Sequence, residues 1–166
     1  MAENDRDSDI KKLAELMKGI KFAMLTTINE DGSLHSRPMT TQDVEFDGEL
    51  WFFTGAHAPK VWESEEHRQV NVAFADPQKQ TYISASGTAQ LVRDRSKIEE
   101  LWKPVYKTFF PKGLEDPELA LLRIKVDKAE YWDAPSSAIG RAFNFAAAYI
   151  TRDPGKLGDH AKVNLA

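Results

Sequence analysis

The spacing of apolar residues along the chain changes from helical to extended near residue 20. Before that point, apolar side chains recur every three or four residues, which is the pattern of a helix with one buried stripe. Asp7 or Ser8 is suited to cap this helix, and Gly19 to end it. We expect the helix to cover one end of a sheet. The apolar stripe consists of Ile10, Leu13, Leu16, Met17 and Ile20.

The following segments have the composition of β-strands. Residues 22–28 are rich in β-formers and apolar at nearly every position, which predicts a strand buried on both faces. A turn at 29–32 leads into a returning strand at 33–40. Asp47-Gly48, a favoured type I′ pair, predicts a second hairpin between 44–46 and 49–54. Further strands are predicted at 70–75, 80–92 and 119–132.

These elements together predict a mainly β fold with flanking helices. Gly87 lies within the long segment 80–92, where a bulge or bend would let the sheet curl into an antiparallel barrel. Helices are expected at 59–68, 94–103 and 141–151. We expect one domain over 1–151 and a tail over 152–166 that has little reason to fold alone.

Composition excludes several classes of function. The chain has 166 residues, a net charge of −4 and no cysteine, so disulfides, thiolate metal sites and thiol nucleophiles are excluded. No run of Lys and Arg forms a stripe for nucleic acid. No stretch approaches the ~18 apolar residues of a membrane span, and the charged N-terminus does not resemble a signal peptide. We therefore expect a cytoplasmic protein.

The first candidate site is the strand that contains Pro38. Proline cannot donate to a β-ladder, so this strand is expected at an edge or a local opening of the sheet. Strand alternation places His35, Arg37 and Met39 on one side of it. Arginine beside histidine suits an anion clamp. The alternative is an ordinary solvated face.

The second candidate is Lys60, one residue after Pro59 at a predicted helix start. A cation in the first turn opposes the helix dipole. The conflict disappears if an anion occupies the site, because the free N–H groups and the lysine would both face it. A single surface lysine at a helix start is also common, so this position supports an anion site only together with Arg37.

A third feature is an irregular aromatic segment at 101–111, which is a candidate dimer contact or wall for a planar ligand. The known phosphate loops and the Gly-x-Ser-x-Gly elbow are absent. The four histidines show no metal-binding spacing.

An ordered set of segments resembles the FMN-binding split-barrel superfamily of pyridoxamine-phosphate-oxidase-like proteins, and within it the general stress protein 26 branch. The likeness covers nearly the whole chain. The segments are 24–27, 34–39, 50–54, Lys60, 84–89, 130–132 and 155–165.

The resemblance implies an antiparallel split β-barrel that forms a homodimer with two FMN sites at the interface. Arg37 and Lys60 match positions that bind the FMN phosphate. The positions matching the strand along the flavin, its ring and its ribityl chain are His35, Ser36, Pro38, Met39, Phe53 and Thr54.

The resemblance also assigns two positions from the far strands, and the aromatic segment adds one more. Tyr82 falls where larger oxidases carry a flavin-contacting glutamine, and Trp132 matches a tryptophan that the other protomer contributes. Trp102 is a further candidate flavin contact, which comes from the aromatic segment at 101–111 and not from a family motif.

The resemblance leaves the reaction open. The substrate cluster of true pyridoxine-phosphate oxidases is missing, so vitamin B6 oxidation is not expected. The leading hypothesis is an FMN flavoprotein that acts as an oxidoreductase linked to stress, with no catalytic acid or base of its own and an unidentified substrate or electron donor. The alternatives are a non-catalytic flavin-binding, sensing or buffering dimer, and a split barrel that binds F420 or haem, with His35 or His57 as the haem ligand.

Overall fold

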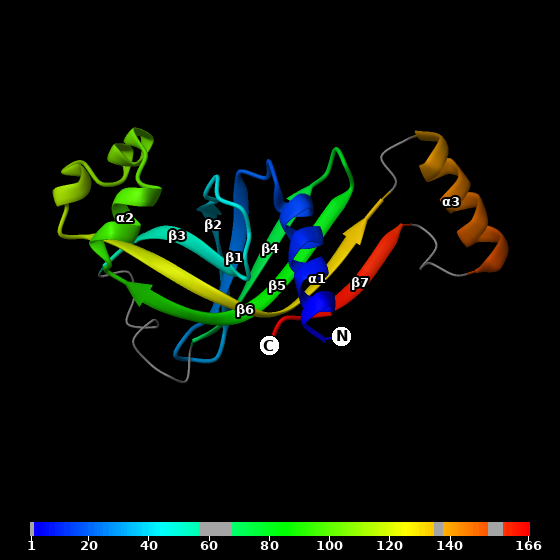
Figure 1. Ribbon diagram of the computed structural model, residues 1–166, viewed down its shortest axis with the longest axis horizontal. Coiled ribbons are helices and arrows are strands. Elements are labelled where there is room, and N and C mark those ends of the chain that lie inside the picture. Colours follow the sequence, from blue (N-terminus) through cyan, green and yellow to red (C-terminus); the bar gives the residue numbers. More distant parts are fainter. Residues whose placement is uncertain (1, 57–67, 135–137, 153–157) are drawn as a thin grey trace.

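The computed structural model describes residues 2–56, 68–134, 138–152 and 158–166, with 2–4 and 138–144 described by backbone alone. Seven strands, three α-helices and two 3-10 turns follow one another along these parts of the chain (Figure 1). In order they are α1 (Ala2–Met17), β1 (Phe22–Ile28), β2 (Leu34–Thr40), β3 (Glu49–Gly55), β4 (Gln69–Asp76), β5 (Thr81–Val92), α2 (Arg95–Leu101), η3 (Pro104–Thr108), η4 (Gly113–Glu115), β6 (Leu119–Asp133), α3 (Ala138–Thr151) and β7 (Asp159–Asn164).

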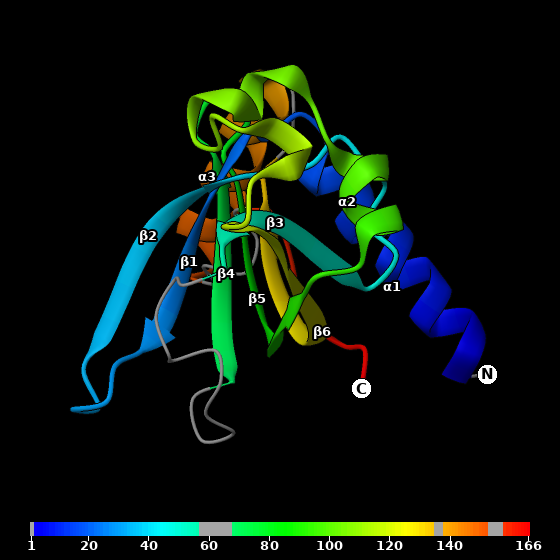
Figure 2. The same ribbon diagram turned by 90° about the vertical axis from the view of Figure 1, so that its left-hand side faces the viewer.

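All the strands belong to one antiparallel sheet whose order is β2-β1-β4-β5-β6-β3, with β7 added to β6. The fifteen-residue β6 pairs with β5 along one side. On its other side its first half pairs with β3 and its second half with β7. β2 and β3 therefore stand at the two ends of the strand order, and the sheet curls without closing (Figure 2).

The predicted bend at Gly87 is confirmed. The register between β5 and β6 shifts between Ser86 and Gly87. A Cβ on Gly87 would lie 2.0 Å from the carbonyl oxygen of Lys125 on β6. Only glycine allows this approach of two backbones, and the bulge increases the local twist that curls the sheet.

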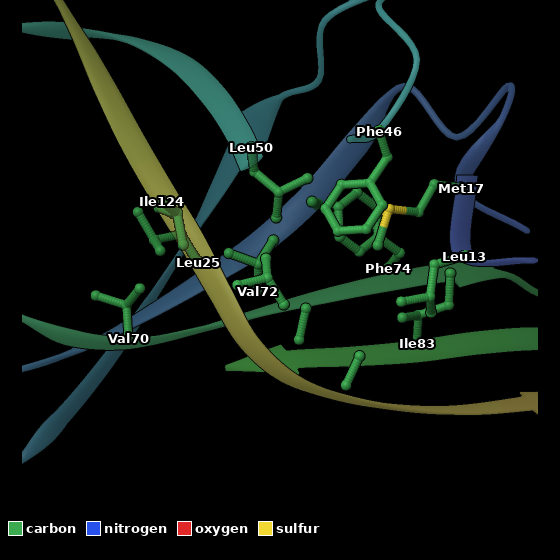
Figure 3. Close-up of a cluster of buried hydrophobic side chains, with 14 of the residues drawn as sticks. Leu13, Met17, Leu25, Phe46, Leu50, Val70, Val72, Phe74, Ile83 and Ile124 are labelled. Atoms are coloured by element: carbon green, nitrogen blue, oxygen red, sulfur yellow. The ribbon is translucent and has the colours of Figure 1, made fainter. Parts of the chain in front are cut away.

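The main core lies between the inner face of the sheet and α1. Figure 3 shows Leu13 and Met17 of α1 pointing at side chains from the strands. Lys12 fixes the helix further, because its Nζ lies 3.4 Å from Asp133 Oδ2 and 3.6 Å from Asp159 Oδ2. Burial lowers the pKa of Lys12, but the carboxylates of Asp133 and Asp159 together with Tyr131 offset this, so the pKa is raised overall.

The expectation that β1 is buried on both faces is wrong. Its residues alternate, with Ala23 and Leu25 buried, whereas Phe22 is 65% exposed and Met24 is 42% exposed. The reason is that α1 covers only the inner face, and no described helix packs on the outer one. The apolar side chains of Phe22 and Met24 are therefore left uncovered on the outer face.

The second predicted hairpin is also wrong. Residues 44–46 form no strand, and β3 pairs instead with β6 over seven residue pairs. Asp47 accepts a hydrogen bond from the backbone N–H of Glu49 through its own side chain (3.1 Å), which makes a local turn without a preceding strand. The long ladder against β6 satisfies more backbone groups than a three-residue partner could.

Other boundaries differ less. α1 begins at Ala2 rather than after Ser8, since acidic residues favour a helix N-terminus. α2 begins after its cap Asp94, whose Oδ1 accepts from the Lys97 N–H (3.0 Å). α3 includes the helix predicted at 141–151. The expected tail contributes β7 to the sheet.

The helix predicted at 59–68 lies outside the described residues apart from Arg68, which is not helical. Among the described residues, no helix combines the length and the apolar character needed to cross a membrane.

Replacing Gly87 tests the role of the bulge. Gly87→Ala forces the new methyl group into the Lys125 carbonyl, so we expect the free energy of unfolding to fall by about 1–3 kcal/mol. Denaturant unfolding followed by circular dichroism measures this. Gln90→Ala is the control on the same strand, because its side chain is exposed and the change should stay within about 0.5 kcal/mol. Equal stability of the two variants would show that the close approach is not needed.

Candidate cofactor site

The strand that contains Pro38 lies at an end of the sheet, as its proline predicts. Among the described strands β2 pairs only with β1, and Pro38 faces Met24 across that ladder. The missing N–H of a proline removes nothing from the sheet at an edge. One side of β2 is therefore open to a ligand or to another chain.

Arg37 and His35 lie side by side on the inner face of this edge strand. Register places Arg37 opposite Leu25 and His35 opposite Thr27, and both partners point inwards. Arg37 Nη2 donates to Thr27 Oγ1 (3.0 Å) and lies 3.3 Å from His35 Nδ1. Thr27 is fully buried, so its hydroxyl provides a rigid anchor that orients the guanidinium. The predicted pairing of His35 with Arg37 is confirmed.

An aromatic group lies beyond the other end of β2. Phe53 of β3 contacts Trp102 edge to face, with ring centroids 5.8 Å apart, and Tyr106 at 4.6 Å. The hydroxyl of Tyr106 donates to Gln42 Oε1 (3.0 Å). Phe53 and Trp102 are among the cofactor-binding residues predicted from the sequence, whereas Tyr106 and Gln42 are not. The irregular aromatic segment pointed towards the tyrosine, whereas nothing in the pattern marked the glutamine.

Gln42 carries an unsatisfied donor. Its Nε2 is buried and has no hydrogen-bond partner among the described residues. Gln42 also lines a cavity of about 590 Å³ between α1 and residues 41–52, whose apolar lining includes Met17, Phe46 and Leu50. A buried donor left unpaired costs about 1–3 kcal/mol, so such a group marks a place where an acceptor is expected.

β2 thus carries a guanidinium, Arg37, at its middle. The chain that follows the strand brings the amide of Gln42 to the aromatic group. Four residues separate Arg37 from Gln42 in the sequence, and β2 ends between them at Thr40. A flavin mononucleotide has a phosphate at one end of a flexible chain and a planar ring with hydrogen-bond acceptors at the other. The guanidinium on β2 and the buried amide donor of Gln42 are suited to a ligand that carries both an anion and hydrogen-bond acceptors.

The remaining predicted residues do not all join this site within one chain. Met39 packs against the main core, and Thr54 is half-buried in β3. Ser36 lies on the outer face, where its Oγ is 2.7 Å from Thr26 Oγ1. Pro38 shares that face. Lys60 and His57 lie outside the described residues.

Tyr82 and Trp132 also lie on the outer face of the sheet. They face each other across the β5–β6 ladder and are 43% and 41% exposed. The Trp132 ring stacks on His160 of β7, with centroids 5.3 Å apart and planes within 8°. Because Arg37 belongs to the inner face, these two aromatic residues and the guanidinium do not surround one ligand in a single chain.

The described residues contain no cluster of three or more His, Cys, Asp or Glu side chains that could hold a metal ion. The guanidinium of Arg37 at this site suits an anionic ligand.

The chain matches the family model described as pyridoxamine 5'-phosphate oxidase like over residues 8–154. The chain belongs to this family. The match extends from α1 to just beyond α3, so it includes β2, β3 and the aromatic segment. The open antiparallel sheet described above corresponds to the split barrel expected from the sequence.

Proteins similar to this chain include one curated protein and many solved structures. Protein bli-3 of Neurospora crassa is 29% identical over 158 residues, which cover 89% of this chain and 76% of that protein. The structure of the general stress FMN/FAD binding protein of Xanthomonas citri is 30% identical, with a TM-score of 0.63 over 81% of this chain and 92% of the other. A general stress protein 26 from Jannaschia, 22% identical, shares the fold with a TM-score of 0.71 over 99% of each chain.

Removing the anchor of Arg37 tests the geometry of the site. Thr27→Val keeps the size of the side chain but removes the acceptor of Arg37 Nη2. We expect unfolding free energy to fall by about 1–2 kcal/mol, because the hydrogen bond is charge-assisted but partly screened by solvent. Chemical denaturation measures the loss. Thr27→Ser keeps the oxygen and is the control; if serine and valine at this position behave alike, the hydroxyl does not hold the arginine.

Proposed function

We propose that this protein is an FMN-binding flavoprotein whose phosphate site is formed by Arg37 and Lys60. The observation that carries the proposal is the guanidinium of Arg37, which is held by a buried threonine on the inner face of an open edge strand. A phosphate takes charge-assisted hydrogen bonds from such a group. The name of the Xanthomonas citri relative, an FMN/FAD binding protein, supports a flavin as the ligand.

In this proposal the ring end of the flavin lies near the aromatic group of Phe53, Trp102 and Tyr106. Gln42 Nε2 supplies a hydrogen-bond donor for the acceptor-rich edge of the ring. The bound flavin supplies the electron-transfer chemistry. The protein contributes binding, orientation and exclusion of water.

The phosphate assignment is tested with the double variant Arg37→Ala/Lys60→Ala. Each charge-assisted hydrogen bond contributes about 1.5–3 kcal/mol, so we expect FMN affinity to fall roughly a hundredfold or more while the protein stays folded. Visible absorbance after desalting, set against protein concentration, measures the retained flavin.

The control for that experiment is Arg93→Ala/Lys125→Ala, which removes the same charges from two exposed positions away from β2. This control should keep its flavin. Normal flavin content in the Arg37 and Lys60 variant would overturn the phosphate site.

The same spectrum distinguishes the cofactor. The two visible bands of oxidised flavin support FMN, or FAD if mass spectrometry of the released ligand gives the dinucleotide. A deazaflavin spectrum or a Soret band would instead indicate F420 or haem. Reduction of the bound flavin by NADH or NADPH would support an oxidoreductase. If neither NADH nor NADPH reduces the flavin, a binding or sensing role is supported instead.

We also propose that the protein acts as a homodimer formed through the outer face of the sheet. This face leaves Phe22, Met24, Tyr82 and Trp132 exposed. Its centre carries neutral polar groups, including Asn71, whose Nδ2 donates to Ser84 Oγ (2.8 Å) and Ser86 Oγ (3.1 Å). A two-fold axis brings like residues together, so an uncharged centre avoids self-repulsion.

A dimer of this kind would also explain why the predicted site residues lie on two opposite faces of the sheet. Trp132 and Tyr82 lie on the opposite face from Arg37 in one chain, so they would serve the flavin of the partner copy rather than their own. The expected family arrangement, with flavins at the interface, follows from that exchange.

Polar substitution on the outer face tests the dimer. Phe22→Ser/Met24→Ser removes two exposed apolar side chains from β1, so we expect the monomer–dimer Kd to rise roughly tenfold or more. Sedimentation or light scattering at several protein concentrations measures the shift. Val44→Ser, at a residue that is 46% exposed and lines the cavity beside α1, is the control and should leave the Kd unchanged. A dimer equally stable in both variants would place the interface elsewhere.

A further inference from the structure

The last helix, α3, carries three apolar side chains that no described part of its own chain buries. Phe145, Tyr149 and Ile150 are 67%, 81% and 79% exposed. Phe145 and Tyr149 lie one turn apart on the helix, and Ile150 is adjacent to Tyr149. No other described element packs extensively against α3, and Figure 1 shows the helix standing away from the end of β6 and β7. An apolar patch of this kind marks an interaction surface.

A second uncovered apolar surface lies at the opposite end of the molecule. Val105 of η3 is 63% exposed and Phe109 is 69% exposed, four residues apart, whereas Tyr106 and Phe110 of the same segment are buried. Figure 1 places this segment, beside α2, at one end of the longest axis and α3 at the other. One chain therefore cannot bring its two surfaces together.

We propose that α3 packs on residues 101–111 of a second copy of this chain, and that two such contacts clasp the dimer. A two-fold axis perpendicular to the long axis places each end of one copy over the opposite end of the other. Each dimer then contains the α3 contact twice, as an isologous interface requires. This inference rests on the proposed dimer and adds a specific contact to it.

The charge of the helix favours a protein partner over a lipid surface. Within α3 the one charged residue is Arg141 in the first turn, and residues 142–151 contain no charged side chain. A helix that lies on a membrane needs a basic polar face beside its apolar one, which this stretch lacks. A neutral apolar helix is instead suited to the aromatic and aliphatic side chains of the opposite segment.

Cysteine pairs test the contact directly, because the natural chain has no cysteine. In Phe109→Cys/Ile150→Cys, air or copper oxidation, or a short bismaleimide, should link two chains into a covalent dimer visible on a non-reducing gel. The single variants Phe109→Cys and Ile150→Cys should remain mostly unlinked. So should Val44→Cys/Ile150→Cys, in which the second thiol lies in a different exposed loop.

A second measurement does not depend on thiol geometry. Tyr149→Asp places a charge in the proposed contact and should raise the monomer–dimer Kd roughly tenfold or more, whereas Tyr149→Phe should leave it nearly unchanged. Both substitutions are at a surface position, so the monomer should stay folded.

The outcomes separate this inference from the proposals on which it rests. A dimer by light scattering that shows neither the cross-link nor the effect of Tyr149→Asp would overturn the α3 contact and leave the dimer standing. A cross-link within one chain would overturn the α3 contact. A monomeric protein would overturn both the α3 contact and the proposed dimer. Flavin content is measured separately and tests only the cofactor assignment.

Discussion

The structure depends on the pairing of β6, which forms hydrogen-bonded ladders with three other strands. β5 occupies one side of it, whereas β3 and β7 share the other. Because β3 is attached there, the sheet ends at β3 and β2 and does not close. The bulge at Gly87 supplies the curvature, since the backbone of β5 approaches that of β6 too closely for any side chain. An open, curled sheet with an accessible edge strand is the result.

The accessible edge determines where chemistry can take place. β2 carries Arg37 into a position where Thr27 can hold it, and the chain leaving β2 carries Gln42 to the hydroxyl of Tyr106. The strand therefore connects an anion-binding group with an aromatic group through its own backbone. Arg37 is held by its strand and by Thr27, and Gln42 by its hydrogen bond to Tyr106, so both groups have defined positions.

Coverage of the sheet on one face only has a second consequence. α1 and the main core protect the inner face, whereas Phe22, Tyr82 and Trp132 remain exposed on the outer one. The exposed surface of α3 adds to the apolar area without a partner. These surfaces give a physical reason to expect a second copy, because a two-fold arrangement allows each to be buried without any further protein.

The sequence by itself determined the type and approximate position of most elements, the bend at Gly87 and the pairing of His35 with Arg37, because these follow from local periodicity and backbone sterics. It predicted the β1–β2 hairpin, but it did not show that β3 pairs with β6 rather than with 44–46, or that residues 159–164 also pair with β6. Nor did it indicate that β1 has an uncovered face, or that Gln42 meets Tyr106. These features depend on contacts between segments far apart in the chain, and local pattern carries no information about which distant segment will supply the partner.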